Sequence, residues 1–431
     1  MKKKTAVNML KFIDKSPTPF HVIENIKETL EKDSFSEYSE KDSWKLWNGM
    51  KGYVTRGDSS IVAFRIPNCN KIKGFHIYSA HSDSPAFKLK EKSELNNEFG
   101  LVRVNTEKYG GMILSSWLDR PLSVAGRVIY EKNGELTGKL VNIDRDLLVI
   151  PNVAVHMNTS INSGYEYKAQ TDMLPVFKSS DDKETMESAV AAAAGLKKEE
   201  ILGSDLFVYA RQKGTFLGPK DEFVLSPRLD DQACVYAGLS AFAGLDTGNE
   251  SFSDGEYINV FAVFDNEEVG SGTARGADST FLEDVLFRIS EALSLSRTDY
   301  LRMLADSFAV SADNAHAVHP AMPGKADIVN RPIINGGVVV KFNANQHYTT
   351  DGFSSAKIRS IAKKAGVRLQ NFVNNSDVRG GSTLGNISTS HVSINTVDIG
   401  LAQLAMHSSV ETMGAYDIED MIKLVEGFYG D

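Results

Sequence analysis

The sequence predicts an α/β protein whose catalytic domain is interrupted by a β-rich insertion. From Asp231 onward, helix-like and strand-like patterns alternate, as they do in a sheet covered by helices. Residues 101–150 are instead rich in strand patterns, and Lys132-Asn133-Gly134-Glu135 contains the asparagine-glycine pair of a tight hairpin. We therefore expect residues 1–94 and 219–431 to form one discontinuous domain, with the insertion at residues 95–218.

Two helices are expected within residues 5–33, separated by Ser16-Pro17-Thr18-Pro19, because proline lacks the N–H donor that a helix interior needs. Strands are expected at residues 53–66 and 72–80. The second of these strands leads directly to His81. Side chains that follow the strands of an α/β sheet gather at its carboxyl edge, where such proteins build their sites.

Further elements follow from the same patterns. In the insertion, the alanine-rich segment 183–200 predicts a helix and residues 206–210 predict a strand. The remainder of the catalytic domain is expected to contain helices at 232–245, 281–293 and 354–365 and strands at 258–264, 307–312 and 338–342.

The composition excludes several classes of partner. The chain has 431 residues, a formal charge of −9 and a pI of about 5.6, which argues against nucleic acid and anionic membranes, since both need a basic face. No run of about 18 apolar residues predicts a membrane span. The basic start is followed by Lys11, Asp14 and Lys15 where a signal peptide has its apolar stretch.

The cysteine content points to a reducing compartment. Cys69 and Cys234 are the only two cysteines, too few for a disulfide framework or a thiolate metal site. The sequence therefore predicts a cytoplasmic protein, and any metal must be held by histidine and carboxylate side chains.

Two adjacent glutamates, Glu267 and Glu268, follow the predicted strand 258–264 and precede a glycine-rich turn. Neighbouring side chains of an extended chain point in opposite directions, so one carboxylate can hold a metal while the other faces the substrate. One ligand beside one general base is the minimum for metal-assisted hydrolysis. Taken alone, the pair is more simply read as a solvated loop.

A wider set of residues makes the metal interpretation attractive. It supplies two imidazoles, two aspartates and one glutamate as ligands, with one glutamate left over, which suits two divalent ions that share a carboxylate. Nitrogen and oxygen ligands favour zinc, with cobalt or manganese as alternatives. Asp83 can orient the ring of His81 as a second-shell partner. In chain order the set is His81, Asp230, Glu267, Glu268, Asp313 and His407, and His391 competes with His407 on sequence alone.

Six segments, in order along essentially the whole chain, resemble the motifs of the aspartyl aminopeptidases, a family of two-metal peptidases. They are Ser79-Ala80-His81-Ser82-Asp83-Ser84-Pro85, Ser116-Trp117-Leu118-Asp119-Arg120, Pro227-Arg228-Leu229-Asp230, Asp265-Asn266-Glu267-Glu268-Val269-Gly270-Ser271, Ser311-Ala312-Asp313-Asn314-Ala315-His316-Ala317-Val318-His319-Pro320 and Gln403-Leu404-Ala405-Met406-His407-Ser408.

The resemblance implies a mixed-sheet zinc-exopeptidase fold and a role for each ligand. Asp230 is expected to bridge two ions. The other ligands are His81 and Asp313 at one site and Glu268 and His407 at the other.

The resemblance also implies the base and one unusual peptide bond. Glu267 is expected to take a proton from the attacking water and deliver it to the leaving amine. The family motif falls on His407 and not on His391. Relatives have a cis peptide after the bridging aspartate, which places one between Asp230 and Asp231.

Assembly is part of the implied mechanism. The family forms tetrahedral dodecamers built from dimers, and the insertion is the expected dimerisation domain. Val153-Ala154-Val155-His156 matches a motif whose histidine reaches the active site of a neighbouring subunit. His156 is therefore a candidate catalytic residue that stabilises the substrate carbonyl as it becomes an oxyanion. A buried structural histidine is the alternative.

Substrate preference is the least determined property. Lys341 matches a lysine associated with acidic side chains of the substrate, and Tyr348 matches a tyrosine near the scissile carbonyl. A lysine at the end of an apolar strand can pair with a carboxylate, or it can extend away from the sheet into solvent. Asp231 and His347 replace residues that are common in the family, asparagine and arginine, so acidic and neutral preferences both stay open.

The sequence thus predicts a metalloaminopeptidase that acts on short peptides with a free N-terminus, favouring Asp or Glu, through a hydroxide activated by two metal ions. Three alternatives remain. They are an aminopeptidase with a neutral, Leu-type preference, a two-metal amidohydrolase acting on N-acyl amino acids, and a non-catalytic scaffold.

Overall fold

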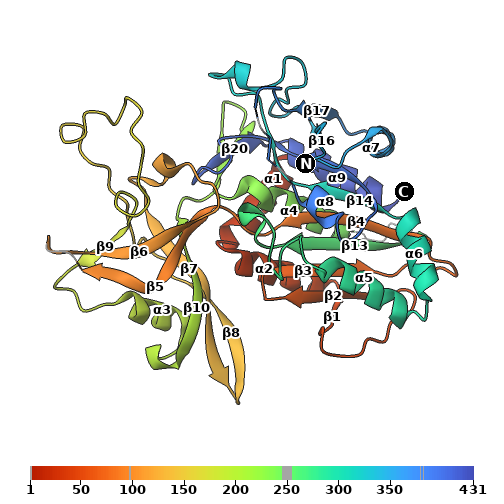
Figure 1. Ribbon diagram of the computed structural model, residues 1–431, viewed down its shortest axis with the longest axis horizontal. Coiled ribbons are helices and arrows are strands. Elements are labelled where there is room, and N and C mark those ends of the chain that lie inside the picture. Colours follow the sequence, from red (N-terminus) through yellow and green to blue (C-terminus); the bar gives the residue numbers. More distant parts are fainter. Residues whose placement is uncertain (1, 97–98, 245–254, 379, 382) are drawn as a thin grey trace.

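The computed structural model describes residues 2–96, 99–244, 255–378, 380–381 and 383–431 (Figure 1). Among these residues, the largest sheet has nine strands in the order β1-β2-β3-β13-β4-β14-β18-β16-β17. Four neighbours, β13, β4, β14 and β18, run parallel, while β3 and β16 pair antiparallel to their inner neighbours. The mixed α/β sheet expected from the sequence is confirmed. The strands are β1 (Ser36–Glu37), β2 (Lys51–Arg56), β3 (Ser60–Arg65), β4 (Gly74–His81), β13 (Tyr257–Phe264), β14 (Phe308–Ala312), β16 (Val338–Phe342), β17 (Leu369–Val373) and β18 (Asn395–Gly400).

Helices cover both faces of this sheet. Along β13, Phe261 and Val263 pack with one group of helices, while Val260 and Ala262 pack with the other, as the two-residue repeat of a strand dictates. The first group is α1 (Lys2–Lys15), α2 (Pro19–Lys32), α4 (Leu229–Gly244), α7 (Gly352–Ala365) and α9 (Asp417–Tyr429), and the second includes α5 (Phe281–Ala292), α6 (Arg297–Asp306) and the short α8 (Leu384–Ser388).

A second sheet extends to one side of the main sheet, at the left of Figure 1. In the described chain it has six strands in the order β8-β7-β10-β5-β6-β9, and α3 (Met186–Ala194) packs against it around its own apolar core. Asn133 and Gly134 both have positive φ (56° and 82°) and connect β7 to β8, which is the predicted hairpin. The strands are β5 (Ala86–Asn96), β6 (Leu101–Tyr109), β7 (Leu122–Lys132), β8 (Glu135–Asn142), β9 (Val176–Ser179) and β10 (Ile201–Ala210).

A third, smaller sheet lies next to the main one. Within the described residues its strand order is β11-β12-β20-β19-β15. The loop between β19 and β20 contains His407, so this sheet positions one of the candidate ligands. The strands are β11 (Thr215–Leu217), β12 (Phe223–Ser226), β15 (Ala315–His316), β19 (Ala402–Leu404) and β20 (Glu411–Gly414).

Several predicted boundaries were wrong. The helix expected at 183–200 is only α3, because the Thr185 side chain caps its first turn and Gly195 ends it with a φ of 62°. Residues 53–66 form two strands, β2 and β3, instead of one. The helix expected at 232–245 corresponds to the regular part of α4, because Asp230 and Asp231 have non-helical φ and ψ, and its last expected residue, Leu245, lies outside the described residues.

Other elements were not anticipated. The central strand β18 and the helix α9 both lie beyond the last predicted helix, yet α9 packs closely on α4 and supplies Leu424 and Phe428 to the core. In the parts of the chain that are described, no helix combines the length and apolar character that crossing a bilayer requires.

Candidate metal centre

Three neighbouring parallel strands bring four candidate residues to one edge of the main sheet. His81 is the last residue of β4, Asp313 follows β14, and Glu267 and Glu268 form a short 3-10 turn after β13. Because β13, β4 and β14 are adjacent and parallel, their carboxyl ends meet.

The remaining two candidate ligands come from irregular backbone. Asp230 lies at the start of α4, where it and Asp231 have non-helical φ and ψ. The peptide bond between them is cis, as the resemblance implies. His407 has a φ of 66°, in the left-handed region that a histidine adopts rarely.

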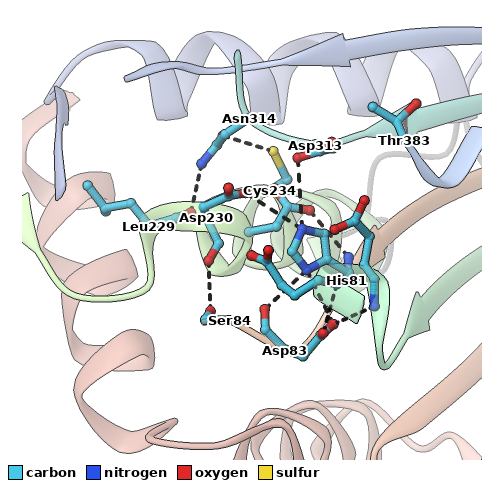
Figure 2. A network of polar contacts seen from close by, with 12 residues as sticks. His81, Asp83, Ser84, Leu229, Asp230, Cys234, Asp313, Asn314 and Thr383 are labelled. Carbon is cyan, nitrogen blue, oxygen red and sulfur yellow. Dashed lines mark hydrogen bonds and ion pairs between the residues drawn. The ribbon is translucent and has the colours of Figure 1, made fainter. Parts of the chain in front are cut away.

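Asp230 lies between two histidines, His407 and the His81 that Figure 2 shows beside it. Its Oδ1 is 3.6 Å from His81 Nε2, and its Oδ2 is 3.4 Å from His407 Nε2. His81 Nε2 is also 3.8 Å from Asp313 Oδ1, and His407 Nε2 is 3.2 Å from Glu268 Oε2. Thus one carboxylate faces a His-Asp pair with one oxygen and a His-Glu pair with the other. Ligand atoms in each half lie within 4.8 Å of one another.

Asp83 fixes the orientation of the His81 imidazole through the ring nitrogen Nδ1, which faces away from Asp230. Its Nδ1 is 3.1 Å from the main-chain oxygen of Asp83 and 3.4 Å from the Oδ1 of the same residue. A proton on Nδ1 leaves the lone pair of Nε2 directed at Asp230 and Asp313, which is the tautomer that a metal ligand needs.

Asp83 organises the glutamate turn as well. It is fully buried, and its two carboxylate oxygens accept hydrogen bonds from the main-chain N–H groups of Glu267 and Glu268, both at 3.1 Å. Asp83 therefore contacts both the ring of His81 and the turn that carries the two glutamates.

The centre concentrates negative charge away from water. Burial raises the pKa of Glu268 well above its usual range, and the nearby Asp230 adds to this shift. For Asp230 burial acts in the same direction, but the nearby imidazoles of His407 and His81 outweigh it and lower the pKa. Among the described residues, Asp230 Oδ1 and Glu268 Oε1 are buried without a hydrogen-bond partner. Such oxygens are costly to bury unless a cation pairs with them, so the donor set fits divalent metal ions.

Glu267 lies beside the ligands. One of its carboxylate oxygens falls within the same 4.8 Å grouping as His81 and Glu268. Burial raises the pKa of Glu267 to about 8, His81 opposes the shift, and Asp313 adds to it. A carboxylate with a raised pKa accepts protons more readily than an ordinary glutamate does.

Two buried carboxylates that hold the backbone of the candidate ligands were not identified from the sequence. Glu411 is 2% exposed, and its carboxylate accepts from the main-chain N–H of Asp230 at 3.0 Å and from that of His407 at 2.7 Å. Asp231 is fully buried beside His81, and its Oδ2 accepts a hydrogen bond from the main-chain N–H of His81 at 3.3 Å. For Glu411, the one feature of the sequence that could have indicated a role was a glutamate at the start of the buried strand β20. For Asp231, it was the position next to Asp230.

Lys341 lies next to the centre, but its ammonium group is already hydrogen-bonded to the protein. Its side chain is 2% exposed, and its Nζ donates to the Asp313 carbonyl at 2.8 Å and to Asp313 Oδ2 at 3.2 Å. Burial by itself would lower the pKa of Lys341, but Asp313, Tyr348, Asp398 and Asp231 together raise it above its usual value, so the amine stays charged. The Tyr348 ring centroid is 5.2 Å from the same Nζ. Both predicted substrate-binding residues therefore lie beside Asp313.

Three other histidines lie elsewhere. His391 Nε2 is 2.8 Å from Asp278 Oδ1, away from the ligand cluster. His156 is exposed in the connection between β8 and β9 of the second sheet, and no contact joins it to the cluster in the described part of this chain. His316 lines a cavity of about 290 Å³ that adjoins the centre, since Ala405, two residues before His407, lines it too.

Comparisons with known proteins point to a zinc peptidase family. Residues 12–429 match the family described as aminopeptidase I zinc metalloprotease (M18). The chain is 45% identical over 435 residues to a probable M18 family aminopeptidase 2 of Clostridium novyi, and the match covers 99% of each chain. A protein of the same description from Pseudomonas aeruginosa is 35% identical, over 98% of this chain and 97% of its own.

Solved structures show the same fold. A chain in the cryo-EM structure of the Ape4 and Nbr1 complex matches with a TM-score of 0.96 at 35% identity, over 100% of this chain and 86% of that one. The S. cerevesiae mApe1 dodecamer matches with a TM-score of 0.87 at 29% identity, over 99% and 96% of the two chains. This chain belongs to the M18 family of zinc metalloaminopeptidases.

Proposed function

We propose that the chain removes single N-terminal residues from peptides with a centre of two divalent ions, zinc by preference. The observation that supports this most directly is the position of Asp230, whose two oxygens face two different histidines. A carboxylate so placed suits a bridge between two ions about 3.5–4 Å apart.

The residues divide into two sets around that bridge. One ion is assigned to Asp230, His81 and Asp313, and the other to Asp230, Glu268 and His407. When bound, two such ions polarise a substrate carbonyl and lower the pKa of a water molecule. Glu267, which binds neither ion in this assignment, takes the proton of the water and transfers it to the leaving amine.

We further propose that acidic N-terminal residues are preferred. The ammonium group of Lys341 is a buried positive charge beside Asp313 and Tyr348, and a substrate carboxylate reaching it is stabilised by charge-assisted hydrogen bonding. A neutral preference is the second candidate. It is favoured by the fact that Asp313 and the carbonyl of Asn314 already accept hydrogen bonds from this ammonium group.

The assembly proposed is a tetrahedral dodecamer built from dimers, with residues 95–218 as the inserted dimerisation domain. The mApe1 relative is itself a dodecamer. Val153, Val155 and Met157 are exposed around His156, an apolar surface that suits contact with another subunit. In this arrangement His156 stabilises the oxyanion in the site of a neighbouring chain.

A cytoplasmic location completes the proposal. Cys69 and Cys234 are both free, as expected in a reducing compartment. The substrates are short, unfolded peptides, because a closed assembly excludes folded proteins from its interior.

The function is tested with peptides that begin with Asp, Glu, Leu or Lys, each with a free and with an acetylated amine. The zinc-loaded enzyme should cleave only the free amines, and Asp and Glu fastest. Faster cleavage of Leu peptides would favour the neutral alternative and remove Lys341 as the specificity residue. Cleavage of the acetylated series alone would indicate an amidohydrolase, and no cleavage at all would indicate a scaffold.

Replacing Glu267 by alanine tests the proposed base. The Glu267→Ala enzyme should bind as much zinc as the wild type, because the ligands are unchanged, while kcat falls by about 10²–10⁴-fold. Stopped-assay kinetics and metal analysis measure the two properties. Near-normal turnover would assign the base to another group.

Replacing Glu411 by glutamine tests how the ligand backbones are held. An amide offers one oxygen where the carboxylate offers two, so the N–H of either Asp230 or His407 loses its acceptor. Metal affinity should fall about 10–100-fold in a chelator competition. The control is Glu419→Gln, a buried glutamate of α9 paired with Lys423. Equal affinity in both variants would contradict the role of Glu411.

Mixed assemblies test His156. The His156→Ala enzyme should lose about 10²–10³-fold in kcat, the usual cost of removing an oxyanion donor, whereas His391→Ala, which removes a ring paired with Asp278 away from the cluster, should not. Refolding His156→Ala with Glu267→Ala chains should restore activity, since each mixed pair contains one intact site. If the mixture stayed inactive, His156 would not act across subunits.

A further inference from the structure

The second sheet contacts the metal centre through residues 109–116, the segment that leads out of β6. Tyr109 is the last residue of β6, and the segment reaches the 3-10 turn Leu114–Trp117. All of the candidate ligands belong to the main sheet, α4 or the loop before β20. Segment 109–116 is therefore the place where the two parts of the molecule meet around the ligands.

At the start of the segment, the Tyr109 hydroxyl donates to Asp83 Oδ2 at 2.7 Å. The same carboxylate oxygen accepts the N–H of Glu268 at 3.1 Å. The hydroxyl oxygen also accepts a hydrogen bond from Asn266 Nδ2 at 2.9 Å. Tyr109 thus connects the two sides of the turn that presents Glu268.

The two glycines that follow pack directly on ligands. Gly110 has a φ of 74°, and a Cβ at this position would lie 3.1 Å from the Cβ of Glu268. A Cβ at Gly111 would lie 3.8 Å from His407 Nδ1, so the main chain of Gly111 passes close to this ring. A larger side chain at Gly110 would push Glu268 out of place, so the close approach itself is part of the site.

The far end of the segment fixes the loop that presents His407. The Ile113 N–H donates to the His407 carbonyl at 3.0 Å. Ser116 Oγ accepts from the Ser409 N–H at 2.9 Å, and the Ser116 carbonyl accepts from Ser409 Oγ at 2.6 Å. Since His407 has a left-handed backbone conformation, these bonds stabilise a conformation that the loop would seldom adopt alone.

The contacts are unequal between the two halves of the centre. Segment 109–116 packs directly on Glu268 at Gly110 and bonds His407 at Ile113. It reaches His81 only indirectly, through the bond of Tyr109 to Asp83, whose main-chain oxygen is the nearer partner of the His81 ring, and Asp313 is bonded to Lys341. We infer that segment 109–116, with Tyr109 as its positioning residue, sets the geometry and metal affinity of the Glu268–His407 half of the centre. This inference rests on the two-ion assignment proposed above.

The test compares zinc occupancy at each half by anomalous diffraction from crystals equilibrated at graded zinc concentrations. Tyr109→Phe removes only the hydroxyl. Half-occupancy at the Glu268–His407 half should need about 10–100-fold more zinc, while the His81–Asp313 half fills as in the wild type. The control is Tyr53→Phe, which removes a hydroxyl that donates to Glu31 at 2.8 Å, away from the ligands.

Kinetics distinguish positioning from a general structural role. At limiting zinc, kcat of Tyr109→Phe should fall with KM little changed, and excess zinc should restore kcat. Equal loss of occupancy at both halves, or activity that excess zinc does not restore, would reduce Tyr109 to a structural residue and overturn the inference. Occupancies identical to the wild type would overturn it as well.

A second pair of variants probes the other end of the segment. Ile113 has a φ of −80°, which proline adopts, so Ile113→Pro removes the N–H bonded to His407 with little change in backbone conformation. It should weaken zinc at the same half, whereas Ile113→Ala, which keeps the N–H, should not. Identical occupancies in the two variants would count against the inference.

Failure of this inference is separable from failure of the proposed function. A wild-type enzyme that holds zinc in both halves and cleaves no peptide would contradict the function alone. A wild-type enzyme that cleaves peptides, with variants that bind zinc normally, would contradict the role of segment 109–116 alone.

Discussion

The structure depends on a cluster of carboxylates that has been taken out of water at one edge of the main sheet. Asp83, Asp230, Asp231 and Glu411 are buried, with Glu267, Glu268 and Asp313 beside them. Two carboxylates at 4 Å repel by about 4 kcal/mol at an effective dielectric constant of 20. Nearby positive charges, and the metal ions that the family uses, offset that repulsion. The surrounding fold holds the carboxylate oxygens in the positions that metal ions would need.

The molecule uses main-chain donors to hold this cluster. Asp83 accepts two N–H groups from the glutamate turn, and Glu411 accepts one from Asp230 and one from His407. A hydrogen bond to an ionised carboxylate contributes about 1.5–3 kcal/mol, more than a bond between neutral groups. The same bonds fix the backbones that carry the ligands, so charge balance and ligand geometry are maintained together. The segment 109–116 adds the second sheet to this arrangement.

The sequence was sufficient for the parts that follow local rules. Nearly continuous apolar runs marked strands such as β13 and β16, and Asn133-Gly134 marked the hairpin between β7 and β8. The candidate ligands His81, Asp313 and the glutamate pair each follow a predicted strand, and the structure brings them to one edge of the main sheet. The prediction made helix α3 too long because its alanine-rich sequence favours a helix throughout, whereas in the structure Gly195 ends the helix.

What could not be predicted depends on long-range contacts. Glu411 lies 181 positions after Asp230, and nothing local connects the two. In the sequence, Tyr109 looks like any aromatic residue of a strand. Its role becomes visible only in the structure, where the end of β6 lies against the Asp83 carboxylate. Lys341 was expected to face the substrate, and only the packing of β16 beside Asp313 shows how fully its ammonium group is engaged.

The central claim, that the buried carboxylates form a centre for two ions bridged by Asp230, is tested most directly by zinc binding to the metal-stripped wild-type chain. Equilibrium dialysis followed by elemental analysis gives the number of zinc ions per chain. The account predicts two tightly bound ions per wild-type chain, with the affinity for both reduced in Asp230→Asn because each half shares that carboxylate. A wild-type stoichiometry of one, or an Asp230→Asn chain that still binds two ions with unchanged affinity, would contradict it.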